Sequence, residues 1–523
     1  MALADASGEG SGSIQLKARN IFIGDGSKVF IQSRGLKSGG KINVNATESI
    51  KVVGNSLDES FSTTLLTETN NVGNAAKIEI TTPSLLVSQG AVVITQTFSS
   101  GRGGDINIDA SESLQISESS PINSTNDTEI STLSFNSGAA GDINISTKQL
   151  SILREDIQSR NFGIGGGGNI SVLTENLKLI DGGGIASINL GIGSGGDVNI
   201  DSKSIELTGV DLNTFFPSVL SASTIGSGNA GSLTISTGSL VIKDGGRVDS
   251  STGASGNSGS VTINATDFIE VSGSVPGSVN HSLIISSANF IDESLQQLLG
   301  LPPIPSGNSG NVTINSPVLK VSDGAEVTVR NDGIGRGGIL NINANSTLLN
   351  STGKITASTQ SGGGGNIDLQ LKDGLILRNQ SLISAEAMGM GNGGNININS
   401  PVIAGVENSD IITNAVRGDG GNININTSGL FGLQFREKLT IESDITASSE
   451  FGVNGKVNIN NPAIDPSSSL LQLPTDVVDE SQEVASGCSV YQGNSFTVVG
   501  KGGLPANPAD VITSLTLWND LRN

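Results

Sequence analysis

The chain has 523 residues, of which 71 are glycine, 35% are hydrophobic and only 3% are aromatic. Its 49 acidic and 28 basic residues give a formal net charge of −21 without any basic run, which argues against nucleic acid and anionic membranes as partners. Cys488 is the single cysteine, so an internal disulfide bond and a cysteine-based zinc site are excluded. No apolar stretch is long enough for a transmembrane helix, and the opening MALADASGEG lacks the features of a signal peptide.

One five-residue pattern recurs along the chain, and it reads glycine, a small or polar residue, then apolar, polar, apolar. Successive copies mostly start about 28 residues apart, a period typical of solenoids, propellers and arrays. The fifteen copies, the third of them degenerate, start at Gly12, Gly40, Ala76, Gly104, Gly141, Gly168, Gly196, Gly231, Gly259, Gly310, Gly338, Gly365, Gly394, Gly421 and Gly455.

A second apolar run follows the first in each repeat, as at Leu240, Ile242 and Val248. Both runs alternate apolar with polar residues, which indicates strands, and Asp244-Gly245 between runs indicates a sharp turn. The unit is too short for a propeller blade, and no helical pattern lies between the strands. We therefore predict an all-β fold, a right-handed parallel β-helix of about 15 coils over residues 1–461.

Stacking of the coils assigns a direction to each side chain of the pattern. The two apolar residues of each triplet should point inward and meet their equivalents one coil away. The glycine should occupy a tight corner where a Cβ would clash. The middle residues should point outward and pair along the stack: Asn43, Asn107, Asn144, Asn199, Thr234, Thr262, Thr313, Asn341, Asn397, Asn424 and Asn458.

Two segments depart from the repeat. The insertion at residues 275–306 predicts a short helix capped by Asp292, with a stripe of Leu295, Leu298 and Leu299. We expect this helix to pack against the side of the stacked coils, and a knob that binds a partner is the alternative. Residues 462–523 form a separate, irregular C-terminal element, either a cap on the last coil or an anchor.

Residues 445–522 contain ITASSEFGVNGKVNINNPAIDPSSSLLQLPTDVVDESQEVASGC, then GNSFTVVGKGGLPANP, then LWNDLR. Together with the repeats over residues 12–460, this ending resembles that of the large exoproteins of the filamentous-haemagglutinin family, especially the cyanobacterial type called S-layer family proteins. The resemblance implies two-partner secretion through an outer-membrane partner. It also implies a secreted or outer-membrane surface location and an adhesive or structural role with a carbohydrate or protein ligand. The family's export domain has no counterpart here, so we expect this chain to be a fragment.

The residues that could carry chemistry are few, and we predict no catalytic, cofactor-binding or metal-binding residues. His281 is the only histidine and reads as a loop residue, while Cys488 has no histidine nearby to activate it. The alternative to a non-enzymatic rod is a carbohydrate-active β-helix enzyme, a polysaccharide lyase or hydrolase, with an ice- or mineral-templating array as a third reading. Such an enzyme needs paired carboxylates and aromatic side chains in a groove. Asp368 is the only Asp at the outward, middle position of the repeated triplets, and Tyr491 and Trp518 lie in the tail.

Overall fold

The computed structural model describes residues 3–56, 58, 60–120, 127–275 and 281–461. The chain divides into two units, Met1–Ala463 and Ile464–Asn523. The predicted C-terminal cap or anchor, with Cys488, Tyr491 and Trp518, lies outside the described residues.

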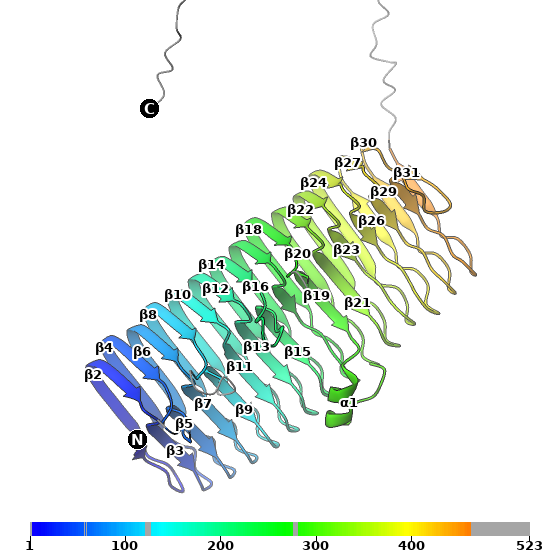
Figure 1. Cartoon of the computed structure of the whole chain (residues 1–523). Coiled ribbons are helices and arrows are strands. Elements are labelled where there is room, and N and C mark those ends of the chain that lie inside the picture. The colour runs from blue at the N-terminus through cyan, green and yellow to red at the C-terminus, as the bar shows by residue number, and fades with distance from the viewer. Residues whose placement is uncertain (1–2, 57, 59, 121–126, 276–280, 462–523) are drawn as a thin grey trace, which may run out of the picture. The chain divides into compact units, whose positions relative to one another are not determined.

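The described part of the first unit is a parallel β-helix in which successive coils stack along one axis (Figure 1). Each coil gives one short strand to a 16-stranded sheet and one long strand, or two segments of it, to a second sheet. The short-strand sheet contains, in order of pairing, β1 (Leu3–Asp5), β3 (Lys28–Ser33), β5 (Thr64–Thr69), β7 (Val92–Thr97), β9 (Glu129–Ser134), β11 (Asp156–Asn161), β13 (Gly184–Asn189), β15 (Val219–Thr224), β17 (Arg247–Asp249), β19 (Leu283–Ala288), β21 (Glu326–Asn331), β23 (Lys354–Thr356), β25 (Leu382–Ser384), β28 (Asp410–Ile412), β32 (Asp444–Thr446) and β31 (Gln434–Phe435).

The long-strand sheet pairs in the same parallel manner from one coil to the next. Its described strands form fifteen levels, which confirms the expected number of coils; β26 and β27 share one level, as do β29 and β30. The strands are β2 (Ile14–Gly24), β4 (Lys41–Val53), β6 (Lys77–Ser88), β8 (Ile106–Ser117), β10 (Ile143–Leu153), β12 (Ile170–Ile180), β14 (Val198–Thr208), β16 (Leu233–Lys243), β18 (Val261–Ser272), β20 (Val312–Ser322), β22 (Ile339–Asn350), β24 (Asn366–Leu377), β26 (Ile396–Asn399), β27 (Val402–Gly405), β29 (Ile423–Asn426), β30 (Gly429–Phe431) and β33 (Val457–Asn460).

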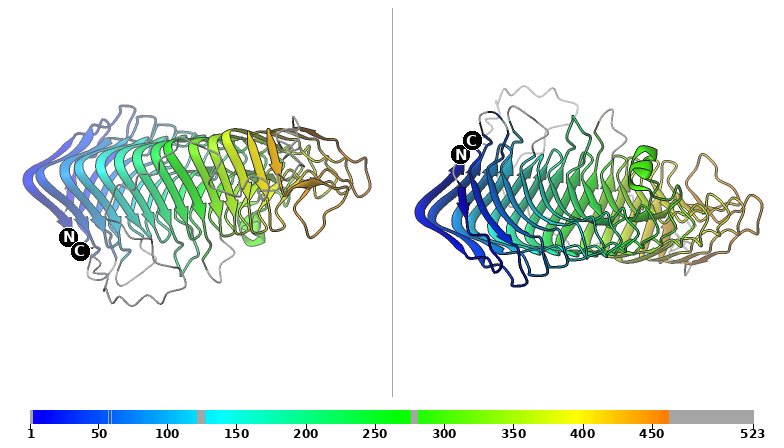
Figure 2. Two further views of the ribbon diagram at one scale, coloured as in Figure 1. Left: turned by 90° about the horizontal axis from the view of Figure 1, so that it is seen from above. Right: turned by 90° about the horizontal axis from the view of Figure 1, so that it is seen from below.

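The long strands bend near their middle, as the views from above and from below show (Figure 2). Several pairings shift register at this bend because one strand carries an extra residue there; between β8 and β10 the shift lies at Thr147–Gln149. A bulge of this kind bends the strand that carries it. The bend divides the long strand into two arms, which together with the short strand make the two or three runs per coil that the sequence predicts.

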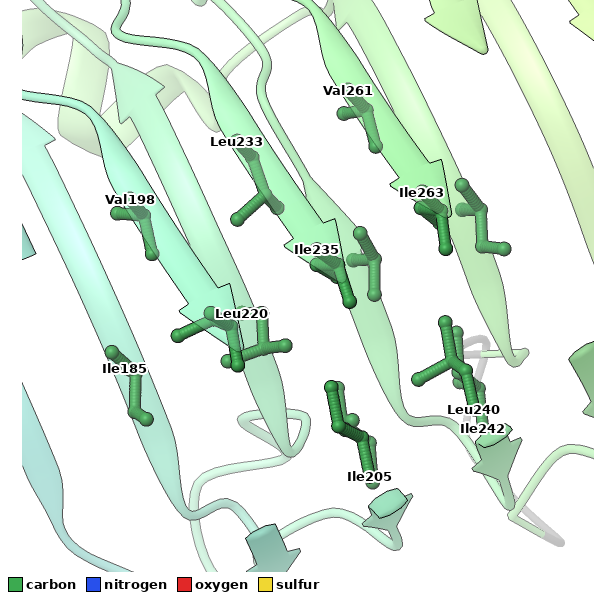
Figure 3. Close-up of a cluster of buried hydrophobic side chains, with 14 of the residues drawn as sticks. Ile185, Val198, Ile205, Leu220, Leu233, Ile235, Leu240, Ile242, Val261 and Ile263 are labelled. Atoms are coloured by element: carbon green, nitrogen blue, oxygen red, sulfur yellow. The ribbon is translucent and has the colours of Figure 1, made fainter. Parts of the chain in front are cut away.

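Apolar ladders fill the interior, and Figure 3 shows one stretch of them. Val198 pairs in register with Leu233, which pairs with Val261, and all three are fully buried. Burying each such side chain contributes roughly 1.5–3 kcal/mol, so these ladders are the main source of stability. The predicted inward direction of the apolar residues is confirmed.

Amide ladders cover the outside of the same strands. Asn144 Nδ2 donates to Asn107 Oδ1 at 3.0 Å. Asn424 donates to Asn397 Oδ1 at 3.0 Å, and Asn458 donates to Asn424 Oδ1 at 3.1 Å. The outward direction and the hydrogen bonding along the stack are therefore confirmed for these positions.

The two corners of the coil differ in backbone packing and conformation. Before most of the long strands a glycine packs against the preceding coil; a Cβ on Gly168, for example, would lie 1.7 Å from the carbonyl oxygen of Gly141. The predicted clash is confirmed. At the other corner Asp244 and Gly245 adopt φ values of 51° and 91°, the left-handed conformation that the predicted sharp turn requires.

The insertion contains the predicted helix, α1 (Glu293–Leu299), and Asp292 Oδ1 accepts a hydrogen bond from the backbone N–H of Ser294 at 2.9 Å. The insertion contacts the coils, but not through Leu298 of the predicted stripe, which is 78% exposed; the side chain of Leu295 lies outside the described part. Ile291 makes the contact instead, because its side chain occupies the space that a Cβ on Gly253 would take. Within the described ranges no helix has the length and apolar character to cross a membrane.

Candidate functional site

A long open groove follows the bend of the long strands across ten coils, from β8 to β26, and encloses about 1420 Å³. With a spacing of about 4.8 Å between strands, ten coils extend over about 40 Å. We call this feature the groove. Its lining residues are Asp109, Ser111, Ser146, Thr147, Lys148, Leu173, Thr174, Glu175, Asp201, Ser202, Lys203, Ser236, Thr237, Gly238, Asn264, Ala265, Thr266, Asp267, Asn315, Ser316, Pro317, Asn343, Ala344, Asn345, Gln370, Leu371, Lys372 and Asn399.

A second hollow of about 820 Å³ adjoins the groove on the first arm of the strands from β6 to β16. The two share Asp109, Ser146, Leu173, Asp201 and Ser236 among their lining residues. The outer face of the long strands is therefore hollowed continuously, and most widely over the earlier coils.

The groove arises from the alternation of the strands. The residue two positions after the middle of each triplet also points outward, and it is the last outward position before the bend. In register, Asp109 pairs with Ser146, Ser146 with Leu173, Leu173 with Asp201, and Asp201 with Ser236. Our sequence analysis examined only the middle of the triplet and missed this column, although the same period of two predicts it.

Charged groups in the groove nearly balance. Four carboxylates and three lysines line it, which leaves a formal charge of −1, compared with −21 for the chain. Lys203 Nζ lies 3.1 Å from Glu175 Oε2, and Lys148 Nζ lies 2.9 Å from Glu112 Oε1. The hydrogen bond to Glu112 raises the pKa of Lys148, so this lysine is charged at neutral pH.

Two carboxylates of the groove lie on adjacent coils. Asp201 pairs in register with Leu173, and Glu175 follows Leu173 by two residues on the same strand. Glycoside hydrolases place two carboxyl groups about 5 to 9.5 Å apart, on either side of the bond that they cleave. Here Lys203 holds Glu175 in an ion pair, and no aromatic side chain lines the groove among the described residues.

A separate acidic cluster lies at a corner between coils. Glu155 is only 2% exposed; its Oε2 accepts a hydrogen bond from the backbone N–H of Thr128 at 2.7 Å, and its Oε1 has no hydrogen-bond partner among the described residues. Burial raises the pKa of Glu155 to about 8. Burial also raises the pKa of the neighbouring Asp156 to about 6. In the part of the chain described here, no three His, Cys, Asp or Glu residues are arranged to hold a metal ion.

Of the residues singled out from the sequence, neither His281 nor Asp368 lines the groove, although Asp368 contacts Gln370, which does. His281 Nε2 is 3.2 Å from Glu326 Oε2. Burial alone would raise the pKa of Glu326, but hydrogen bonds from His281 and Thr356 lower it overall. Asp368 occupies the outward column between Asn341 and Asn397, and its Oδ1 accepts a hydrogen bond from Gln370 at 2.6 Å.

The class that the fold and the groove define is a parallel β-helix with a long polar groove on its outer face. No family model, no curated protein and no solved structure matches this chain. The resemblance to the filamentous-haemagglutinin family therefore remains a prediction.

Proposed function

We propose that this chain is a non-enzymatic attachment rod, an adhesin or structural protein of the filamentous-haemagglutinin type. In this proposal it reaches the cell surface or the medium through an outer-membrane secretion partner. There it binds a carbohydrate or protein of a cell or matrix. The observation that carries the proposal is the groove, which offers similar polar positions on ten successive coils.

A repeated surface of this kind suits attachment more than turnover. Each coil contributes a weak, polar contact, and contacts to one long ligand add up because the coils are fixed relative to one another. Register hydrogen bonds and buried ladders hold that spacing constant, as between β10, β12 and β14. The ion pair between Lys203 and Glu175 further occupies a carboxylate that a hydrolytic mechanism would need.

The test combines adhesion with an assay for cleavage. Purified chain is coated on beads, and bead retention on polysaccharide-coated, protein-coated and bare surfaces is measured in flow. The same polysaccharides are incubated with soluble chain, and reducing ends and unsaturated products are quantified. We expect retention above the bare surface and no products; products that increase with enzyme-like turnover would contradict the proposal.

A second candidate, a polysaccharide hydrolase, is favoured by one observation only, the placement of Glu175 and Asp201 on adjacent coils. It predicts that Glu175→Gln and Asp201→Asn each abolish product release. Asp109→Asn serves as the control, because this residue lies in the same column as Asp201 but three coils away. Cleavage that survives both substitutions would exclude this pair as the catalytic one.

A further inference from the structure

We infer that the ligand of the groove is an uncharged, linear polysaccharide that lies along the stack of coils. The inference rests on the proposed function and names the chemical class of its ligand. It is carried by the hydrogen-bonding capacity, the charge and the length of the groove.

The hydrogen-bonding capacity comes from an amide ladder in the centre of the groove. Asn315 Nδ2 donates to Asn264 Oδ1 at 2.8 Å, and Asn343 Nδ2 donates to Asn315 Oδ1 at 2.8 Å. A primary amide has two N–H donors and an oxygen with two lone pairs. Asn315 uses one donor and one lone pair within the ladder, so one of each remains for a ligand.

A sugar hydroxyl matches this remaining pair, because it donates one hydrogen bond and accepts others. The ladder holds each amide in a fixed orientation before the ligand arrives, which reduces the entropy lost on binding. Ser236 continues the same column on the preceding coil and adds a hydroxyl. Successive coils therefore present donors and acceptors at a regular spacing, as a chain of repeated sugar units requires.

The charge of the groove selects against ionic polymers. A polyanion would need an excess of lysine or arginine, but the lining carries −1 within a chain of −21. A polycation would be drawn to the more acidic remainder of the surface as strongly as to the groove. Lys203 and Glu175 neutralise each other, and the column that carries the amide ladder is uncharged from Ser236 to Asn343.

The length of the groove sets the size of the ligand. It extends over ten coils, or about 40 Å, and is open to solvent along its course. None of its described lining residues is aromatic, so no ring is available to stack on a sugar and affinity must accumulate from many hydrogen bonds. Polymers and long oligosaccharides should bind, whereas a disaccharide should not.

The experiment compares polymers that share a backbone but differ in charge. Binding of the full chain to hydroxyethyl cellulose and glucomannan, both uncharged, and to anionic carboxymethyl cellulose is measured by affinity electrophoresis and on a biosensor. Salt is varied from about 0.1 M to 1 M, over which the Debye length falls from roughly 10 to 3 Å. We expect the uncharged polymers to bind with less than a twofold change in Kd, and carboxymethyl cellulose to bind at least tenfold more weakly at low salt.

Two matched variants test whether the groove is the site. Asn264→Ala, Asn315→Ala and Asn343→Ala together remove the central amide ladder. The control combines Asn397→Ala, Asn424→Ala and Asn458→Ala, which removes two equivalent amide hydrogen bonds in a ladder outside the groove. We expect at least a tenfold rise in Kd for the first set and less than a twofold rise for the control, with unchanged circular dichroism in both.

The outcomes separate this inference from the proposed function. No binding of either uncharged polymer, preferential binding of carboxymethyl cellulose, or equal loss in both variants overturns the inference. If beads still adhere to protein-coated surfaces in that case, the attachment function stands. If the uncharged polymers bind but reducing ends appear, the class of ligand stands and the non-enzymatic function fails.

Discussion

Burial of Glu155 should make the stability of the protein depend on pH. The residues in register with Glu155 on the adjacent coils cannot cause this effect, because they do not titrate. In register with it, the preceding coil carries Thr128 and the following coil carries Gly183, so a carboxyl group replaces a small side chain. With a pKa raised to about 8 by burial, this group holds its proton in the folded state up to mildly alkaline pH. In the unfolded chain it ionises near its ordinary value of 4.5.

The sign of the effect follows from proton binding. Between pH 4.5 and 8 the folded state binds one proton more than the unfolded state, so stability falls as pH rises through this window. The pKa difference corresponds to an upper bound on the order of 5 kcal/mol, and relaxation of the corner will reduce it to a few kcal/mol. Glu155→Gln should therefore be nearly neutral at pH 4.5 and should stabilise the protein by a few kcal/mol at pH 8.

The assay is urea-induced unfolding of wild type and variant at pH 4.5, 6, 7 and 8, with hydrogen exchange of β9, β11 and β13 as a local measure. Asp156, whose pKa is about 6, also contributes at lower pH, so the difference between pH 7 and 8 isolates Glu155. Glu326→Gln is the control, and it should destabilise the protein above pH 4.5. The reason is that the lowered pKa of Glu326 stabilises the folded state at these pH values. Equal pH slopes for wild type and Glu155→Gln would refute the reasoning.

Three further predictions, two of them with a control substitution, concern the ladders, a corner and the stacked rings, and each is tested by chemical unfolding. Ile342→Asp should lower the stability by several kcal/mol, because it buries an unpaired charge. The control Asn341→Ser, at an outward position, should change stability by less than about 0.5 kcal/mol. Equal losses for the two variants would contradict the assigned inward and outward directions. Gly168→Ala should cost at least about 1–3 kcal/mol, because its Cβ would lie 1.7 Å from a carbonyl oxygen, and Gly363→Ala, with nothing within 4 Å, should be silent. Phe135→Ala should lower the stability by about 1–3 kcal/mol, because the centroid of the Phe135 ring lies 4.9 Å from that of Phe98 and 5.2 Å from that of Phe162 in stacked pairs. An unchanged stability would show that these exposed stacks do not stabilise the fold.

The coil architecture could be predicted from the sequence because its cause is local and repeated. The alternation in a triplet such as Ile143-Asn144-Ile145 fixes both the strand and the face of each residue. The preceding Gly141 marks a corner, because the close approach of its neighbour leaves no room for a Cβ. Fifteen copies of one local rule therefore determined the fold.

The features that the sequence did not predict depend on contacts with side chains of neighbouring coils. The groove comes from the alignment of Ser146, Leu173 and Asp201 across coils, and the chemical character of this column depends on which residue each coil places there. The raised pKa of Glu155 comes from its burial at a corner, since its own segment reads as an ordinary polar turn. The helix and its cap at Asp292 were predicted, but the contact of the insertion with the coils was not, because Ile291, which precedes the helix, lies against Gly253.

The separation of inner and outer ladders explains how one fold can combine stability with a variable binding surface. Inward positions such as Ile145, Val172 and Ile200 are restricted to apolar residues, because each must fill the space between its two neighbours. The adjacent outward column accepts serine, leucine and aspartate in succession without altering the register. Changes in the groove should therefore alter ligand preference at little cost in stability, and the coil spacing that makes binding cumulative is maintained by residues that never contact the ligand.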